Sequence, residues 1–200
     1  MPMIAITNLK GGTGKTTSSI LLAEALYRLG QKVIVFDADP QASASIWAAD
    51  AAQEETGPLH FDVVPANVQS IKAGIADRDT IVIVDCPPGM PTVIEAAINA
   101  ADVILIPVSP SGIEVSRMWD TIEVAQEKGK DFGVLLTSVV LNTKTLQEVL
   151  DALNEEEIPM YTTRIPQRQD IKRLWGTTCE GQLHGYQYLA QEILELGAAA

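Results

Sequence analysis

The sequence contains few cysteines and no apolar segment long enough to cross a membrane. Its only cysteines, Cys86 and Cys179, lie far apart and lack the spacing of metal ligands. Asp102 interrupts the longest apolar candidate. The N-terminus leads into a strand-like segment rather than a cleavable signal. These absences argue against a disulfide scaffold and a membrane protein, and they favour the reducing cytoplasm.

Positive charge is also scarce, with 14 Lys and Arg against 26 Asp and Glu, a net charge of −12. Such a chain repels phosphate at long range unless its cations are clustered. There is one cluster, formed by Arg164, Arg168, Lys172 and Arg173. Arg168 and Lys172 are four residues apart, which predicts a shared helical face. DNA contact by this cluster competes with a nucleotide or dimer interface and with a solvated surface.

No Pro/Ser-rich linker, long charge block or repeat divides the chain, so we expect one domain over residues 1–200. The alternation of strand-like and helical patterns predicts a three-layer α/β domain with a mostly parallel central sheet. Strands are expected near 3–7, 32–36, 60–64, 80–84, 102–107, 133–139 and 158–162. Helices are expected near 14–29, 41–49, 67–75, 91–99, 112–128, 144–154, 168–175 and 184–196.

Residues 10–17 read Lys-Gly-Gly-Thr-Gly-Lys-Thr-Thr and follow the first expected strand. Their end, Gly14-Lys15-Thr16, fits a phosphate-binding loop, although Leu9 stands where the first glycine is usual. Glycines let backbone N–H groups approach a phosphate, and the following helix points its positive end there. Lys15 adds a point charge, and the Thr16 hydroxyl can reach Mg²⁺. The pattern predicts a nucleotide phosphate site.

Lys10 is a second cation, five residues before Lys15. One lysine suffices to hold a phosphate from within the chain, so the second needs a target of its own. The simpler alternative is a glycine-rich turn with a solvated lysine pair.

Carboxylates follow two of the expected strands. Asp37 and Asp39 come after residues 32–36, and Asp85 comes after residues 80–84. Both runs are rich in β-branched residues, as in a parallel sheet covered on both faces, where ligands bind beyond the carboxyl ends of the strands. Such carboxylates can hold Mg²⁺ through waters or orient an attacking water. A single Asp there is more often a cap or turn residue, and this alternative stays open for Asp37.

Taken together, these motifs resemble the ParA/MinD family of deviant Walker ATPases. The resemblance is strongest to short ParA-type partition proteins without an N-terminal DNA-reading domain. It rests on Asn8 to Thr17, on Asp37-x-Asp39-Pro40-Gln41 and on Asp85-Cys86-Pro87-Pro88. Looser matches are residues 101–108, 141–143 and 165–168.

The resemblance implies a role for each site residue. Lys10 would reach across an ATP-sandwich dimer to the partner's nucleotide, while Lys15 serves its own. Asp39 would orient or activate the attacking water. Thr16 would bind Mg²⁺ and Asp85 would bind it through a water, while Asp37 would support these ligands without contacting the ion. The ATP contacts would be Lys10, Gly11, Gly12, Thr13, Gly14, Lys15, Thr16 and Thr17, the last at the α-phosphate, with Asn142, Pro166 and Gln167 at the adenine side.

The implied function is that of a cytoplasmic, nucleoid-associated ATPase that dimerises with ATP and binds DNA without sequence preference. A small centromere-binding or cargo-adaptor protein would stimulate its slow hydrolysis, and the cycle would drive partition of a plasmid or chromosome. The alternatives within the family are a protein cargo, such as an organelle or a chemoreceptor cluster, and a MinD-like spatial regulator.

Other classes fit less well. Residues 191–197 are acidic and lack the cations of a membrane-anchoring amphipathic helix. Cys86 and Cys179 do not supply the cluster ligands of a nitrogenase-type iron protein. Nothing marks a pocket for the second substrate of a metabolic ligase or kinase, and Asp39 argues against a regulator without turnover.

Overall fold

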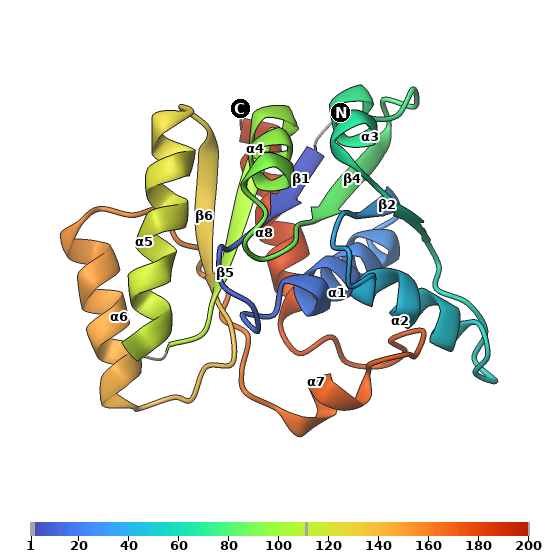
Figure 1. Cartoon of the computed structure of the whole chain (residues 1–200). Coiled ribbons are helices and arrows are strands. Elements are labelled where there is room, and N and C mark those ends of the chain that lie inside the picture. The colour runs from blue at the N-terminus through green and yellow to red at the C-terminus, as the bar shows by residue number, and fades with distance from the viewer. Residues whose placement is uncertain (1–2, 111, 200) are drawn as a thin grey trace.

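The computed structural model describes residues 3–110 and 112–199, and its centre is a parallel sheet covered by helices on both faces (Figure 1). The sheet has six strands in the order β3-β2-β4-β1-β5-β6, every pair parallel. The strands are β1 (Met3–Ile6), β2 (Lys32–Asp37), β3 (Asp62–Pro65), β4 (Thr80–Asp85), β5 (Val103–Val108) and β6 (Asp131–Leu136). The predicted three-layer α/β architecture is confirmed.

Helices connect the strands and divide between the two faces. They are α1 (Lys15–Arg28), α2 (Ser43–Ala51), α3 (Val68–Ala73), α4 (Pro91–Ala100), α5 (Gly112–Glu127), α6 (Lys144–Glu155), α7 (Gln169–Arg173) and α8 (Tyr186–Ala199). Alternate strand residues point to opposite faces, so Ile4 and Ile6 pack with α1, α2 and α8, while Met3 and Ala5 pack with α3, α4 and α5. Among the described residues no helix is both long and apolar enough to cross a membrane.

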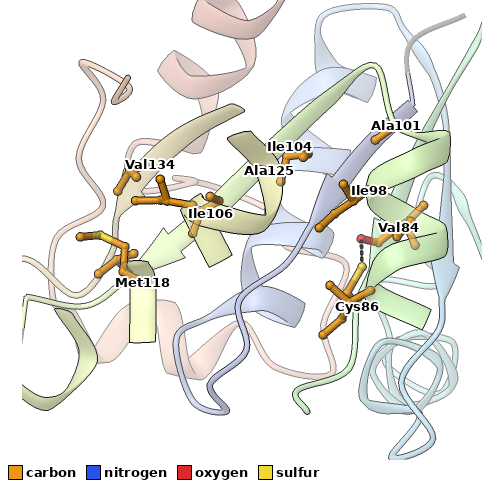
Figure 2. Packing of buried hydrophobic residues seen from close by; sticks show 14 of the residues in the cluster. Val84, Cys86, Ile98, Ala101, Ile104, Ile106, Met118, Ala125 and Val134 are labelled. Atoms are coloured by element: carbon orange, nitrogen blue, oxygen red, sulfur yellow. Dashed lines mark hydrogen bonds between the residues drawn. The ribbon is translucent and has the colours of Figure 1, made fainter. Parts of the chain in front are cut away.

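Figure 2 shows the second of these layers, where Ile98 of α4 and Met118 of α5 pack against strand residues such as Val84 and Ile106. Cys86 lies within this layer, buried, with its Sγ 3.8 Å from the Val84 carbonyl. Burial of this continuous apolar layer supplies the main driving force for folding.

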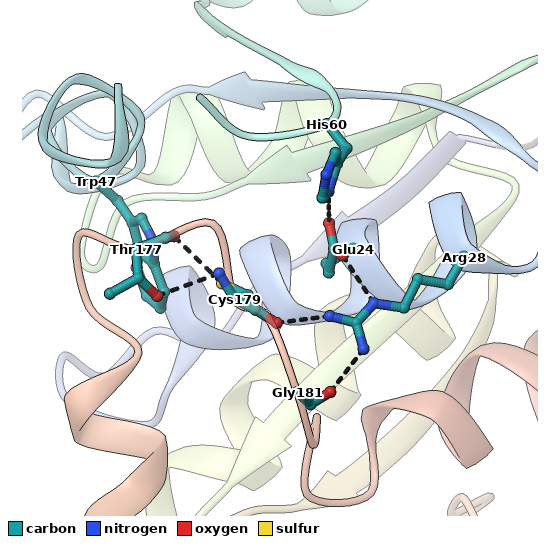
Figure 3. Close-up of polar contacts among 7 residues, drawn as sticks. All are labelled: Glu24, Arg28, Trp47, His60, Thr177, Cys179 and Gly181. Atoms are coloured by element: carbon teal, nitrogen blue, oxygen red, sulfur yellow. Dashed lines mark hydrogen bonds and ion pairs between the residues drawn. The ribbon is translucent and has the colours of Figure 1, made fainter. Parts of the chain in front are cut away.

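A polar network at the far end of α1 fixes the segment that precedes α8 (Figure 3). Glu24 is buried, and its carboxylate accepts hydrogen bonds from Arg28 Nε at 2.8 Å and contacts His60 Nδ1 at 3.0 Å. Arg28 also donates to the carbonyls of Cys179 and Gly181, each at 2.6 Å. A buried carboxylate needs such partners, since an unpaired buried charge is costly.

The seventh predicted strand, at 158–162, is wrong. Met160 of this stretch makes an isolated bridge with Val134 of β6, and a second isolated bridge, between Pro166 and Val139, lies beyond both segments. Ile158 and Tyr161 are buried, which produced the strand-like pattern. Tyr161 N donates to the Val134 carbonyl, whereas the next such bond to β6 comes from Ile165 to Leu136, so extra residues interrupt the ladder.

The helix predicted over 168–175 is shorter than expected. α7 begins at Gln169 and ends at Arg173. Arg168 is its N-cap, with an extended backbone (φ −138°, ψ 138°), so the predicted shared helical face of Arg168 and Lys172 does not form. Both residues remain on the same short exposed segment.

Candidate functional site

Register places the ends of three strands at one edge of the sheet. Asp85, the last residue of β4, is paired with Ile6 at the end of β1 and with Asp37 at the end of β2. The loops that follow these strands carry the glycine loop, Asp39 and the residues after Asp85. This is the carboxyl edge at which parallel α/β sheets bind ligands.

The glycine loop has a backbone that suits glycine at two positions. Gly12 and Gly14 have φ angles of +81° and +90°, which L side chains rarely adopt. Gly14 is the N-cap of α1 and forms no side-chain cap hydrogen bond. No side chain at the N-cap therefore accepts hydrogen bonds from the first N–H groups of α1, and these groups suit an anionic ligand.

Neighbouring strands anchor the loop. Asn8 Nδ2 donates to the Pro107 carbonyl at 2.9 Å, and Asn8 Oδ1 accepts from Lys10 N at 3.0 Å. Thr137, just after β6, donates its hydroxyl to the Thr13 carbonyl at 3.0 Å. Sequence reasoning missed Thr137 because the strand expected at 133–139 included it, whereas β6 ends at Leu136 and leaves Thr137 at the strand end. These bonds hold the loop in one shape before any ligand arrives.

Lys15 is 6% exposed, and its Nζ donates to the Lys10 carbonyl at 2.7 Å. Burial lowers the pKa of Lys15, while nearby Asp85, Cys86 and Asp39 raise it. A buried ammonium has three donors, and a phosphate could accept those that the carbonyl does not use. Lys10 lies half-buried at the start of the same loop.

Asp85 is 1% exposed and incompletely hydrogen-bonded. Its Oδ1 accepts from the Ser19 hydroxyl at 3.1 Å, while Oδ2 has no hydrogen-bond partner among the described residues. Burial raises the pKa of Asp85 to about 7, and Asp37 raises it too, against the Thr16 and Ser19 hydroxyls and Lys15, which lower it. A buried carboxylate in this state favours a cation beside it.

The residues at this position fit Mg²⁺. A carboxylate oxygen without a partner and the neighbouring Thr16 hydroxyl are the oxygen donors that this ion prefers. The described ranges contain no group of three or more His, Cys, Asp or Glu residues that could hold a metal. Asp85 and Thr16 would therefore hold the ion largely through its waters and the phosphates, and the ion would supply positive charge to the polyphosphate.

Asp37 ties the turn that carries Asp39 to the start of α2. The Asp37 carboxylate is 4% exposed and accepts from Asp39 N at 3.2 Å, from Ser45 N at 2.8 Å and from Ser45 Oγ at 2.6 Å. Both oxygens are thus occupied, as in the cap or turn role left open for Asp37. Sequence reasoning did not find Ser45.

Asp39 itself is half-buried, and its Oδ1 accepts from Gln41 N at 2.9 Å. A cavity of about 270 Å³ opens beside it, bordered also by Asp37 and Ser45. This cavity lies at the carboxyl ends of β2 and β3, and no residue of the glycine loop lines it.

The segments predicted for the adenine side lie next to each other. Val139 pairs with Pro166, and Gln167 N donates to the Val139 carbonyl at 2.9 Å. Asn142, shortly beyond Val139, is exposed with a φ of +59°. Thr137 links this strand end to the glycine loop. The structure therefore brings Asn142, Pro166 and Gln167 to neighbouring segments on the loop's side of the sheet.

The four residues of the basic cluster are all exposed. Arg173 pairs with Asp170 at 3.3 Å, a surface contact of little energetic weight. Arg164, Arg168 and Lys172 make no ion pair with any residue of the described ranges.

The family profile described as the CobQ/CobB/MinD/ParA nucleotide-binding domain matches residues 4–177. The chain therefore belongs to this family of ATPases, as its resemblance to ParA and MinD predicted.

Its relatives carry several names. Maintenance of carboxysome distribution protein A of Gloeobacter kilaueensis is 33% identical over 168 residues, covering 80% of this chain and 74% of that protein. Sporulation initiation inhibitor protein Soj of Bacillus subtilis is 30% identical over 211 residues, covering 82% and 83%. Chromosome partitioning protein ParA of Caulobacter vibrioides is 30% identical over 146 residues, covering 52% and 55%.

The fold agrees with these relatives. The septum site-determining protein MinD of Pyrococcus horikoshii, solved with Mg-ADP, has a TM-score of 0.78 to this chain at 17% identity, over 99% of this chain and 98% of that one. A likeness at this identity shows the shared fold, and the Mg-ADP shows that such a fold can hold both nucleotide and ion.

Lys15→Ala should weaken ATP·Mg²⁺ binding at least about a hundredfold, roughly 2.7 kcal/mol, because the phosphates lose the buried cation of their own loop. Isothermal titration calorimetry would measure it, with the exposed Lys72→Ala of α3 as the matched control. Binding within about threefold of the unaltered protein, roughly 0.7 kcal/mol, would contradict the phosphate-loop assignment.

Asp39→Ala should still bind ATP but hydrolyse it at least about tenfold more slowly, since it removes the carboxylate predicted to orient the attacking water. Steady-state phosphate release and nucleotide titration on the same sample would separate the two effects. Asp79→Ala, at the opposite edge of the sheet just before β4, is the control. Loss of binding would instead make Asp39 a structural or metal residue, and unchanged turnover would point to another carboxylate.

Proposed function

We propose that this protein is a Mg²⁺-dependent ATPase that acts as a nucleotide-controlled switch, with residues 1–200 forming a single domain. The observation that carries the proposal is the meeting of a buried Lys15, an incompletely bonded Asp85 and the glycine loop at one sheet edge, with Asp39 on the adjoining turn. Lys15 and the loop N–H groups hold the polyphosphate, and Asp39 orients the attacking water. Positioning and charge stabilisation of this kind supply most of the catalysis in phosphoryl transfer.

Lys10 acts on a second copy of the chain. Its own loop already has Lys15, whose Nζ lies on the Lys10 carbonyl, so another cation is not needed there. Two copies facing each other across their nucleotides would each receive the partner's Lys10. Turnover is slow by itself because the unstimulated site lacks a further stabilising group supplied by another protein.

The ATP-bound dimer binds DNA without sequence preference and drives partition of a plasmid or chromosome in the cytoplasm, at the nucleoid. Support comes from the exposed cations of the basic cluster and from a relative named as a chromosome partitioning protein. Dimerisation would place two clusters together, so that two weak sites act as one stronger site. A small centromere-binding or cargo-adaptor protein stimulates hydrolysis and releases the dimer.

A second candidate is the positioning of a protein cargo. It is favoured by the relative named for carboxysome distribution, which is 33% identical to this chain. The neighbouring genes would separate the two. A small basic DNA-binding protein would favour DNA partition, and an organelle or chemoreceptor operon would favour protein cargo. The third candidate, a MinD-like spatial regulator, is supported only by the similarity of fold to MinD.

Lys10→Ala should bind ATP as a monomer but fail to dimerise, since the missing cation serves the partner's nucleotide. Multi-angle light scattering with a non-hydrolysable ATP analogue would show it, with Lys72→Ala again as control. A normal ATP-dependent dimer in this variant would contradict the proposed contact of Lys10 with the partner's nucleotide.

The double change Arg168→Glu with Lys172→Glu should weaken binding to unrelated duplex sequences equally, because phosphate contacts carry no base information. The unaltered protein should bind duplex DNA only with ATP, and its affinity should fall steeply with salt. Fluorescence anisotropy would measure both, with ATP affinity determined alongside. Full DNA affinity in the variant would place the DNA surface elsewhere. An unaltered protein that binds no DNA even at low salt would favour the protein-cargo candidate.

A further inference from the structure

An exposed tryptophan adjoins the basic cluster. Trp175 is 45% exposed and follows Leu174, the C-cap of α7, and its backbone N–H donates to the Lys172 carbonyl at 3.4 Å. Its ring packs against Trp47 of α2, with 5.0 Å between centroids and 48° between the ring planes. We call Trp175 with Arg168 and Lys172 the Trp175 surface. A single exposed aromatic side chain is common on protein surfaces, but tryptophan is enriched at binding interfaces, where its apolar ring contacts a partner.

The Trp175 ring is held in place from behind. Trp47 is 1% exposed, and its Nε1 donates to the Thr177 carbonyl at 2.9 Å (Figure 3). Gly176, between Trp175 and Thr177 in the chain, has a φ of +71°. A Cβ at Gly176 would lie 3.0 Å from Asp50 Cβ, so the backbone there closely approaches α2. The ring is therefore positioned before a ligand binds, which lowers the entropic cost of binding.

The segment that precedes the ring is positively charged, since Arg168, Lys172 and Arg173 outnumber Asp170, which pairs with Arg173, whereas Asp50 of α2 lies behind Gly176. Arg168 and Lys172 are exposed and make no ion pair within the described ranges, in a chain whose net charge is −12. A ring and two uncommitted cations on one short segment match a polyanion that also offers flat apolar faces. A strand of DNA with unpaired bases has both features, whereas a duplex hides its base faces.

We propose that Trp175 stacks on an unpaired base and that the Trp175 surface binds single-stranded DNA, with Arg168 and Lys172 on its phosphates. The inference rests on the proposed DNA binding and adds to it a contact that is not electrostatic. The two kinds of contact respond differently to salt. Phosphate contacts set the slope of affinity against salt concentration, while stacking shifts affinity without changing that slope.

The test uses the full chain with a non-hydrolysable ATP analogue and a labelled oligothymidylate of about 20 nucleotides, long enough for several binding sites. Anisotropy is measured across a salt series, beside a duplex of equal length. Trp175→Ala should lower single-strand affinity about tenfold at every salt concentration with the slope unchanged, while Trp175→Phe keeps most of it. Arg168→Gln with Lys172→Gln should flatten the slope instead. Tyr27→Ala, an exposed aromatic at the far end of α1, is the matched control.

Thermal unfolding and ATP titration of Trp175→Ala show whether the loss of the Trp47 contact disturbs the fold. If the fold is disturbed, the affinities of Trp175→Phe are used in place of those of Trp175→Ala. Unchanged single-strand affinity in Trp175→Ala, beside intact ATP-dependent duplex binding, would overturn this inference and leave the DNA-binding proposal standing. An equal loss on both forms of DNA would overturn the base-stacking assignment. Binding of polyglutamate that depends on Trp175, with no binding of either DNA, would overturn both in favour of an acidic protein partner.

Discussion

The candidate site depends on the register of β1, β2 and β4. Because Asp85 is level with Ile6 on one side and with Asp37 on the other, three loops leave the sheet at the same height. A slip of one residue would turn the alternating side chains of a strand to the opposite face and destroy both apolar layers. The hydrophobic packing of Ile4, Ile6, Met3 and Ala5 therefore fixes the position of the polar groups at the edge.

The same edge holds charges that the protein alone does not satisfy. Lys15 and Asp85 are both almost fully buried, and the desolvation of each opposes its charged form. Their mutual attraction compensates only in part, since one oxygen of Asp85 has no hydrogen bond among the described residues. Phosphate and Mg²⁺ would complete both sets of contacts, so ligand binding to this site would also stabilise the fold.

Asp37 gives the site a connection to its surroundings. Its carboxylate joins the turn of Asp39 to Ser45 in the first turn of α2. The next turn of α2 carries Trp47, which packs against Trp175. Hydrogen bonds, one turn of α2 and a ring contact therefore connect the backbone of the Asp39 turn to the exposed surface proposed to bind DNA.

The sequence by itself determined the α/β class, the position of the glycine loop and the strand-end carboxylates. These are local features, since glycine content, β-branched runs and the residue after a strand can be read from adjacent positions. Only the tertiary structure decided what depends on distant pairs. Extra residues between Tyr161 and Ile165 broke the strand expected at 158–162, and α7 began after Arg168. The bonds of Thr137 to Thr13 and Ser45 to Asp37, and the packing of Trp175 on Trp47, likewise have no local pattern. Each joins residues on different elements, and such contacts exist only once the sheet and its helices have packed.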